Sequence, residues 1–267
     1  MSADDVTLRQ RYDTARSRRK GSRPCRLRSS LLGISAATTN STALVTGANG
    51  GIGKEIARQL GAAGLTVYVG SRTIERGQRA VDEIVGDARL LVLDVTDPAS
   101  VANAAAQVED LDVLVNNAGV MIDGRAATEA DVDSFRRTYE TNVFGVVAVT
   151  NALLPALRRS AHPRIVNVSS GTGSLGWSTG PNPQFAHQTG GTGAAYRSSK
   201  TALNALTVYY AQALASEGFK VNALAPATVL VETGMVPSPN PRRLSGSTFR
   251  PGSSRLAFAC GTDGPGR

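Results

Sequence analysis

Short apolar runs alternate with longer amphipathic segments along residues 42–224 of this chain. The runs are rich in Val, Leu and Ile and have the length of buried strands, whereas the longer segments repeat their apolar residues at helical spacing. The pattern predicts six strands, at residues 43–45, 65–70, 89–94, 112–116, 164–169 and 219–224. It predicts helices between them, at residues 54–64, 74–85, 97–109, 129–159 and 195–218.

Strands of this composition that alternate with helices indicate parallel βαβ units, with helices on both faces of the sheet. Right-handed crossovers then give an α/β fold with a doubly wound parallel sheet, a Rossmann fold, in a single domain at residues 42–235. Ligands of such folds bind beyond the carboxyl ends of the strands. Most of the motifs described below fall at such ends, so this edge of the sheet is the expected site.

The two ends of the chain follow a different pattern. Residues 1–41 are rich in Arg and Ser with little apolar periodicity, and residues 236–267 are rich in Gly, Pro, Ser and Arg. Low hydrophobicity with high charge is typical of disorder, so we expect a basic disordered N-terminal extension and an irregular basic C-terminal tail. For the N-terminal segment, a targeting peptide around Ser17-Arg18-Arg19 and a nucleic-acid-binding arm are alternative interpretations.

The formal net charge of +8 belongs to these two ends. Residues 1–41 hold nine Lys/Arg and three Asp, residues 236–267 hold five Arg and one Asp, and residues 42–235 hold 15 Lys/Arg and 17 Asp/Glu. The central domain thus lacks the basic stripe that nucleic-acid binding needs. Cys25 and Cys260 lack metal-site spacing, and no run of 18 apolar residues occurs. We therefore expect a cytoplasmic protein with no nucleic acid, membrane or metal partner.

A glycine-rich turn joins the first predicted strand to the first predicted helix. Its glycines are Gly47, Gly51 and Gly53, in the spacing Gly-x3-Gly-x-Gly. Glycines permit a tight turn and close backbone approach, and the N-terminus of the following helix offers free N–H groups to a pyrophosphate. Such a loop alone can be a structural turn, but its place between strand and helix favours nucleotide binding.

The ends of the next two strands indicate which nucleotide is bound. The second predicted strand ends in Gly70-Ser71-Arg72-Thr73, where an NAD site commonly has a carboxylate for the ribose 2′-OH. Arg72 instead suits a 2′-phosphate, because a guanidinium is always charged and can pair bidentately. NADP(H) is therefore favoured over NAD(H); a solvated surface arginine is the alternative. Asp94 ends the third strand, where its carboxylate can accept a hydrogen bond from an adenine amino group.

Tyr196 and Lys200 lie four residues apart in the last predicted helix, so their side chains share one face. A free tyrosine has a pKa of about 10. We expect the Lys200 ammonium to stabilise the phenolate and lower the pKa of Tyr196, which makes the phenol a usable acid or base near neutrality. A Tyr-x-x-x-Lys pair alone is common on surface helices, but Ser169 and Ser170 supply hydroxyls at the end of the preceding strand.

In this order, the motifs resemble those of the short-chain dehydrogenase/reductase family, over residues 42–233. The resemblance rests on Thr46-Gly47-x3-Gly51-x-Gly53, Asn116-Asn117-Ala118-Gly119, Asn142, Ser169-Ser170, Tyr196-x3-Lys200 and Pro226. It implies hydride transfer between a nicotinamide cofactor and a small-molecule carbonyl or alcohol. It also implies catalytic roles: Tyr196 as general acid or base, Ser170 as hydrogen-bond partner of the substrate oxygen, Lys200 as ribose ligand, and Asn142 as holder of a water that links Lys200 to solvent.

The same resemblance implies a set of residues that bind NADP(H), drawn from the glycine turn, the strand ends and the last helix. The set is Thr46, Gly47, Asn49, Gly51, Ile52, Gly53, Arg72, Asp94, Val95, Asn116, Ala118, Gly119, Tyr196, Lys200 and Pro226.

The chain departs from the family pattern in two segments. Residues 171–193 form a long polar stretch that contains Trp177, Phe185 and His187, and it resembles the insertion of the carbonyl-reductase-like branch. Members of that branch are often monomeric because the insertion covers a helix face used for oligomerisation, so a monomer is favoured; a flexible surface loop is the alternative. His187 is a candidate ligand contact.

The second departure is the C-terminus. Ala227 stands where the family usually has a glycine, and after Met235 no segment matches the family's substrate-covering helix or seventh strand. We therefore expect a sheet that lacks the usual last strand, with an exposed edge and an open substrate pocket. A catalytically impaired nucleotide-binding scaffold, or a redox-sensing interaction protein, is the alternative function.

Overall fold

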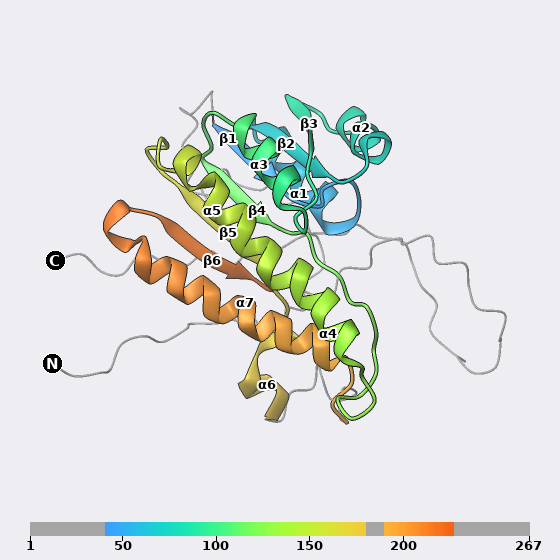
Figure 1. Cartoon of the computed structure of the whole chain (residues 1–267). Coiled ribbons are helices and arrows are strands. Elements are labelled where there is room, and N and C mark those ends of the chain that lie inside the picture. The colour runs from blue at the N-terminus through green and yellow to red at the C-terminus, as the bar shows by residue number, and fades with distance from the viewer. Residues whose placement is uncertain (1–40, 180–189, 227–267) are drawn as a thin grey trace, which may run out of the picture.

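The computed structural model describes residues 41–179 and 190–226. Its centre is a parallel six-stranded sheet in the order β3-β2-β1-β4-β5-β6 (Figure 1). The strands are β1 (Thr42–Val45), β2 (Thr66–Ser71), β3 (Ala88–Val92), β4 (Val113–Asn116), β5 (Arg164–Val168) and β6 (Lys220–Leu224). The predicted α/β fold with a Rossmann-like parallel sheet is confirmed. The expectations for the N-terminal extension, for His187 and for the missing last strand lie outside the described residues.

Helices connect the strands as right-handed crossover units require. They are α1 (Gly51–Ala62), α2 (Ile74–Asp82), α3 (Pro98–Ala106), α4 (Val132–Tyr139), α5 (Gly145–Leu157), α6 (Leu175–Thr179) and α7 (Ala194–Ala213). Three short turns complete the elements: the π-helical turn η2 (Glu140–Phe144) and the 3-10 turns η3 (Gly171–Gly173) and η4 (Ala215–Glu217).

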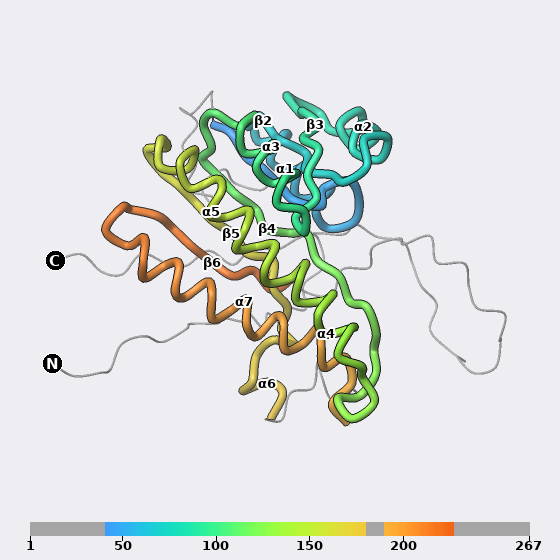
Figure 2. Tube along the Cα trace, viewed as in Figure 1, coloured from blue at the N-terminus to red at the C-terminus, as the bar shows by residue number. Residues whose placement is uncertain are grey.

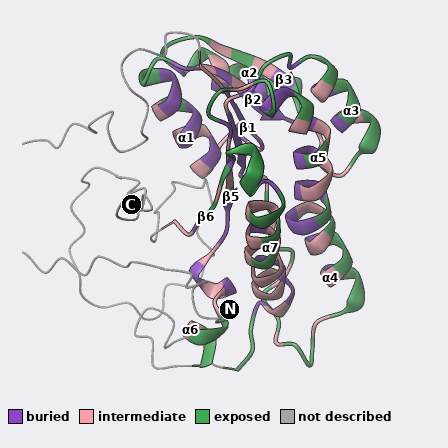
Figure 3. Ribbon diagram, turned by 90° about the vertical axis from the view of Figure 1, so that its left-hand side faces the viewer, coloured by how far each residue is buried: buried purple, intermediate pink, exposed green. Residues whose placement is uncertain are grey.

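The apolar core lies in two layers, one on each face of the sheet. Figure 3 shows α1 on one side of the sheet and α3, α5 and α7 on the other. The α1 face buries side chains such as Ile56 and Val67, and the opposite face buries Leu44, Leu114 and Leu153. Both faces are thus covered, as the near-continuous Val and Leu strands predict.

The strand order reverses between β1 and β4. From β1 the chain moves outward to β2 and β3, then returns to β4 on the other side of β1 and continues to β5 and β6. Helices on opposite faces therefore diverge above the carboxyl ends of β1 and β4, and a crevice forms there. This is the edge at which the sequence motifs were expected.

The predicted helix at residues 129–159 differs from the structure in two ways. It begins at Val132, because the Asp131 carboxylate accepts a hydrogen bond from the Ser134 N–H at 2.7 Å and caps the helix. It also contains the π-helical turn η2, so that α4, η2 and α5 follow one another without a break (Figure 2). Apolar spacing cannot reveal a single π turn, because the turn inserts one residue into an otherwise regular pattern.

Two smaller differences concern the site. Helix α1 starts at Gly51, inside the glycine turn, rather than at residue 54. Strand β3 ends at Val92, so Asp94 lies in the following loop rather than in the strand.

The continuous helical segment Val132–Leu157 is long and apolar enough to cross a membrane, with a mean hydropathy of 1.2 in its most apolar window. Half of that window is buried inside the protein. The segment packs against α3 and α7, which is the arrangement of a core helix.

Candidate active site

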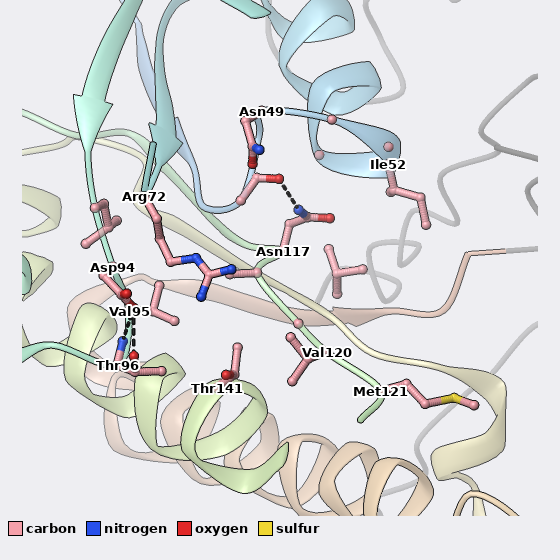
Figure 4. Close-up of a pocket in the computed structure, with 18 of the residues that line it drawn as sticks. Asn49, Ile52, Arg72, Asp94, Val95, Thr96, Asn117, Val120, Met121 and Thr141 are labelled. Atoms are coloured by element: carbon pink, nitrogen blue, oxygen red, sulfur yellow. Dashed lines mark hydrogen bonds between the residues drawn. The ribbon is translucent and has the colours of Figure 1, made fainter. Parts of the chain in front are cut away.

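A cavity of about 750 Å³ opens at the carboxyl edge of the sheet. Its walls come from the glycine turn, the ends of β2, β4 and β5, the loop after β3, and the start of α7. Figure 4 shows side chains from the glycine turn, the end of β2, the loop after β3 and the segment after β4 around the same space. The motifs that are far apart in the sequence thus meet in one place.

The glycine turn can adopt its shape only because glycine has no side chain. Gly47 and Gly51 have φ angles of 62° and 56°, in the left-handed region that favours glycine. A methyl group at Gly53 would lie 2.3 Å from Asn117 Nδ2 and 2.6 Å from the Gly47 carbonyl oxygen. Helix α1 therefore starts in close contact with the strand ends, and no side chain caps its N-terminus at Gly50. This uncapped cradle fits a pyrophosphate, whose oxygens accept from backbone N–H groups.

Two of the predicted cofactor residues brace the cavity without lining it. The Thr46 hydroxyl accepts from the N–H groups of Asn117, at 3.0 Å, and Ala118, at 2.9 Å. The Asn116 amide is buried and donates to Thr150 Oγ1 at 3.0 Å and to Asn167 Oδ1 at 2.9 Å. Both side chains therefore already have hydrogen-bond partners within the protein.

Asn117 lines the cavity in place of Asn116. Its amide donates to the Thr46 carbonyl oxygen at 2.9 Å and to the Gly47 carbonyl oxygen at 3.2 Å. Asn117 thus ties the end of β4 to the glycine turn, as Figure 4 shows for one of these bonds. In a strand, neighbouring residues point to opposite faces, which is the signal that separates Asn116 from Asn117.

At the β2 end of the cavity, Arg72, Thr73 and Arg76 form the wall. Both guanidiniums are exposed, and neither takes part in a salt bridge within residues 41–179 and 190–226. Figure 4 shows the Arg72 side chain extending into the cavity. The sequence motifs did not predict Arg76 as a site residue. Its position four residues after Arg72, at the start of α2, is the feature of the sequence that could have identified it.

The loop after β3 contributes Asp94, Val95 and Thr96 to the wall. One carboxylate oxygen of Asp94 accepts from the Thr96 N–H at 2.9 Å and from the Thr96 hydroxyl at 2.7 Å (Figure 4). These bonds fix the direction of the carboxylate and leave its second oxygen for a ligand donor.

Tyr196, Lys200 and Ser170 come together at the other end of the cavity. Tyr196 is in the first turn of α7, and Lys200 Nζ lies 5.6 Å from the centroid of its ring. Lys200 is almost fully buried, and its ammonium donates to the Val168 carbonyl oxygen at 2.8 Å. Ser170 lies just beyond β5, where its hydroxyl is near enough to affect the pKa of Tyr196 and shares a hydrogen bond of 2.9 Å with Thr172 Oγ1. A hydroxyl, a phenol and an amine therefore form one cluster.

Burial controls the protonation of this cluster. It lowers the pKa of Lys200 to about 8, because a buried ammonium loses its hydration. It raises the pKa of the Tyr196 phenol, and the nearby Ser170 hydroxyl opposes this increase. The expectation that Lys200 lowers the pKa of Tyr196 is therefore wrong for the cofactor-free protein, where loss of hydration is the largest cause of the shift.

Asn142 lies in the π-helical turn η2, behind the cavity wall. Its Oδ1 accepts from the Val120 N–H at 2.8 Å, and its Nδ2 donates to the Val120 carbonyl oxygen at 2.9 Å and to Ser199 Oγ at 3.0 Å. The side chain thus holds the irregular segment that follows Gly119 and does not line the cavity. A methyl group at Gly119 would lie 3.3 Å from Asn142 Oδ1 and 3.4 Å from Lys200 Nζ, so all three residues adjoin.

The structure thus brings most of the predicted site into one cavity and places Thr46, Asn116 and Asn142 behind it. The predicted residues that line the cavity are Gly47, Asn49, Gly51, Ile52, Gly53, Arg72, Asp94, Val95, Ala118, Gly119, Ser170, Tyr196, Lys200 and Pro226. In the described part of the chain, no group of three or more His, Cys, Asp or Glu residues can hold a metal ion.

Comparison with known proteins agrees with this geometry. The short chain dehydrogenase family model matches residues 41–243. The short-chain dehydrogenase anuI of Penicillium roqueforti is 36% identical over 204 residues, which cover 72% of this chain and 79% of that protein. The 3-oxoacyl-[acyl-carrier-protein] reductase FabG of Escherichia coli is 33% identical over 198 residues, covering 72% and 74%.

A solved structure shares the same architecture. The Pseudomonas aeruginosa RhlG/NADP active-site complex matches with a TM-score of 0.63 at 31% identity, covering 72% of this chain and 74% of that one. The chain belongs to the short-chain dehydrogenase/reductase family of NAD(P)-dependent oxidoreductases, which act on CH–OH and C=O groups of small molecules.

Proposed function

We propose that this protein is an NADP(H)-dependent oxidoreductase that interconverts a carbonyl and an alcohol, with Tyr196 as the general acid or base. The observation that carries the proposal is that the glycine turn and the cluster of Tyr196, Ser170 and Lys200 line one cavity. A phosphate cradle at one end and a proton donor at the other are what a nicotinamide-dependent reduction requires from the protein.

The residues present fit the dinucleotide. The uncapped N-terminus of α1 and the glycine turn would hold the pyrophosphate, Asp94 the adenine, and Lys200 the ribose nearest Tyr196. When bound, the cofactor would give a hydride to the substrate carbon during reduction and accept one from it during oxidation.

The chain's own residues handle the proton. During reduction Tyr196 donates its proton to the substrate oxygen, and during oxidation the phenolate takes one. Ser170 lines the cavity together with Tyr196, which places its hydroxyl where it can also hold the substrate oxygen. The burial that raises the pKa of Tyr196 keeps the phenol protonated before reduction. The positive charges of Lys200 and of the oxidised nicotinamide then favour the phenolate.

The preference for NADP(H) over NAD(H) rests on Arg72 and Arg76. Two guanidiniums with no salt bridge in the described residues supply charge-assisted donors for a 2′-phosphate. No carboxylate follows β2 directly to accept from a 2′-OH. The similar RhlG structure is described as a complex with NADP. That description applies to RhlG, and it is consistent with the preference proposed for this chain.

Turnover with a panel of ketones, aldehydes and alcohols tests the enzymatic part of the proposal. We expect NADPH consumption with at least one carbonyl substrate, and tighter binding of NADPH than of NADH in fluorescence titrations. Folded protein that binds NADPH and turns over nothing in a broad panel would instead support the nucleotide-binding scaffold.

We also propose that the protein belongs to the carbonyl-reductase-like branch, is a monomer and is cytoplasmic. The monomer depends on residues 171–193 covering a helix face, and residues 180–189 are outside the described structure. Tyr209 of α7 is 63% exposed, and Phe144 of η2 is 55% exposed. Light scattering coupled to size-exclusion chromatography tests the monomer, because a dimer mass would contradict it.

A further inference from the structure

Away from the cavity, a cluster of charged side chains closes the loop between β4 and α4. Arg125 Nη2 donates to Asp123 Oδ2 at 3.0 Å and also to Asp131 Oδ2. Asp123 accepts in addition from the Arg125 N–H at 3.1 Å and from the Ser134 hydroxyl. Asp131 caps α4 through Ser134. We call these four residues, Asp123, Arg125, Asp131 and Ser134, the loop clasp.

The clasped loop holds the residue that begins α7. The Gly193 N–H is shared between the carbonyl oxygens of Gly124, at 3.2 Å, and Arg125, at 3.0 Å. Next to it, Ala126 and Thr192 form an antiparallel bridge. Figure 2 shows the green turn before α4 beside the start of the orange helix α7.

Gly193 is the N-cap of α7, and its φ angle of 65° lies in the left-handed region. Its carbonyl oxygen accepts the first helical hydrogen bond, from the Arg197 N–H at 2.9 Å. Tyr196 lies between these two residues, in the first helical turn. A helix end frays unless its backbone groups have partners, so the direction of this turn depends on what holds Gly193.

We propose that Arg125 is a positioning residue for Tyr196: by holding Asp123 and Asp131 together it fixes the loop carbonyls that anchor Gly193 and the first turn of α7. What Tyr196 does once positioned rests on the proposed function. An isolated exposed ion pair contributes little to stability. Here one cation bridges two carboxylates, and the Asp123 side chain is only 16% exposed, so the bonds are charge-assisted and partly shielded from water.

Hydrogen–deuterium exchange on the cofactor-free full chain tests this anchor without any need for turnover. The variant Arg125→Ala removes the bridge, and Arg125→Lys keeps a cation that can still reach the carboxylates. Asp131→Asn leaves an oxygen to cap α4 and removes one charge. Arg158→Ala is the matched control: it breaks a pair with Glu217, at 2.7 Å between Nε and Oε2, whose arginine side chain is 49% exposed against 45% for Arg125.

We expect Arg125→Ala to speed exchange at the amides of Gly193 and Arg197 by roughly three- to tenfold, with β1 and β4 unchanged. Asp131→Asn should give a smaller increase at the same amides, Arg125→Lys should restore most of the protection, and Arg158→Ala should leave it unaltered. Wild-type rates at Gly193 and Arg197 in Arg125→Ala would overturn the proposal, and so would an equal rise throughout the sheet.

Turnover separates this inference from the proposed function. If the wild-type protein is active, Arg125→Ala should lower kcat, with the dissociation constant of NADPH within about twofold of the wild-type value, because the glycine turn is untouched. If the wild-type protein turns over nothing, the proposed function fails, and the exchange rates still decide whether Arg125 holds the start of α7.

Discussion

Replacing Gly53 by alanine tests whether the close contact between α1 and the strand ends shapes the cofactor cradle. The new methyl group would lie 2.3 Å from Asn117 Nδ2 and 2.6 Å from the Gly47 carbonyl oxygen, closer than real side chains come. To relieve the contact, Asn117 must give up its bonds of 2.9 and 3.2 Å to the Thr46 and Gly47 carbonyl oxygens, or the turn must move.

The cost can be worked from these contacts. Overpacking of a tight site costs about 1 to 3 kcal/mol, and each lost hydrogen bond costs about 1 kcal/mol. Alanine regains up to about 1 kcal/mol because it favours the helix over glycine. We therefore expect Gly53→Ala to lose about 2 kcal/mol in the free energy of unfolding, and its Tm to fall by about 4 to 8 °C for a domain of this size.

The matched control is Gly50→Ala in the same turn. No atom lies within 4 Å of a methyl group at Gly50, and its φ angle of −178° is extended backbone. Loss of a glycine N-cap costs at most about 1 kcal/mol. Thermal unfolding followed by circular dichroism, with NADPH titrations of both variants, checks the prediction. Equal Tm values and equal NADPH affinities for Gly53→Ala and Gly50→Ala would refute the reasoning.

Three other changes have expected outcomes. Arg72→Ala and Arg76→Ala should each weaken NADPH binding by about tenfold and leave NADH binding unchanged in fluorescence titrations, because each removes a charge-assisted bond to the 2′-phosphate; equal losses for both nucleotides would contradict this role. The folded-state pKa of Lys200, about 8, is below its usual value of 10.5, so the unfolded chain binds more protons between these values. As pH rises through that window, the unfolding free energy of the wild-type protein should therefore increase relative to that of Lys200→Met, by up to about 1.4 kcal/mol per pH unit in urea unfolding. A difference between the two proteins that stays constant with pH would count against burial of the ammonium. Asn142→Ala should lose about 2 to 4 kcal/mol of unfolding free energy, because it leaves both backbone groups of Val120 without their partners; a Tm within 1 °C of the wild-type value (roughly the error of the assay) would show that the pairing matters little.

The sequence predicts the layered fold well because strands buried on both faces must be apolar throughout, as in residues 112–116 and 164–169. It also predicts most of the cavity, because glycines at fixed spacing and a Tyr–Lys pair need little context beyond the strand ends. Local sequence patterns therefore suffice to predict a site residue where its role depends on neighbours within the same short segment.

Sequence reasoning fails where a side chain's partner is far along the chain. Thr46 and Asn116 match a family motif, but their partners across the sheet turn them inward, away from the cavity. Burial of Tyr196 depends on the fold around it, so the direction of its pKa shift was not visible from the nearby Lys200. Arg76 becomes a wall residue only because α2 starts beside the cavity.

Single-turnover oxidation of NADPH by the wild-type protein and by Tyr196→Phe tests the central claim most directly, with a carbonyl substrate found in the panel and with NADPH affinity measured in parallel. Removal of one hydroxyl oxygen leaves the ring and its neighbour Lys200 in place. We predict a rate about 10² to 10⁴ times lower for Tyr196→Phe, with NADPH affinity within about threefold of the wild-type value. Equal single-turnover rates for the two proteins would contradict the account, because another group would then have to supply the proton.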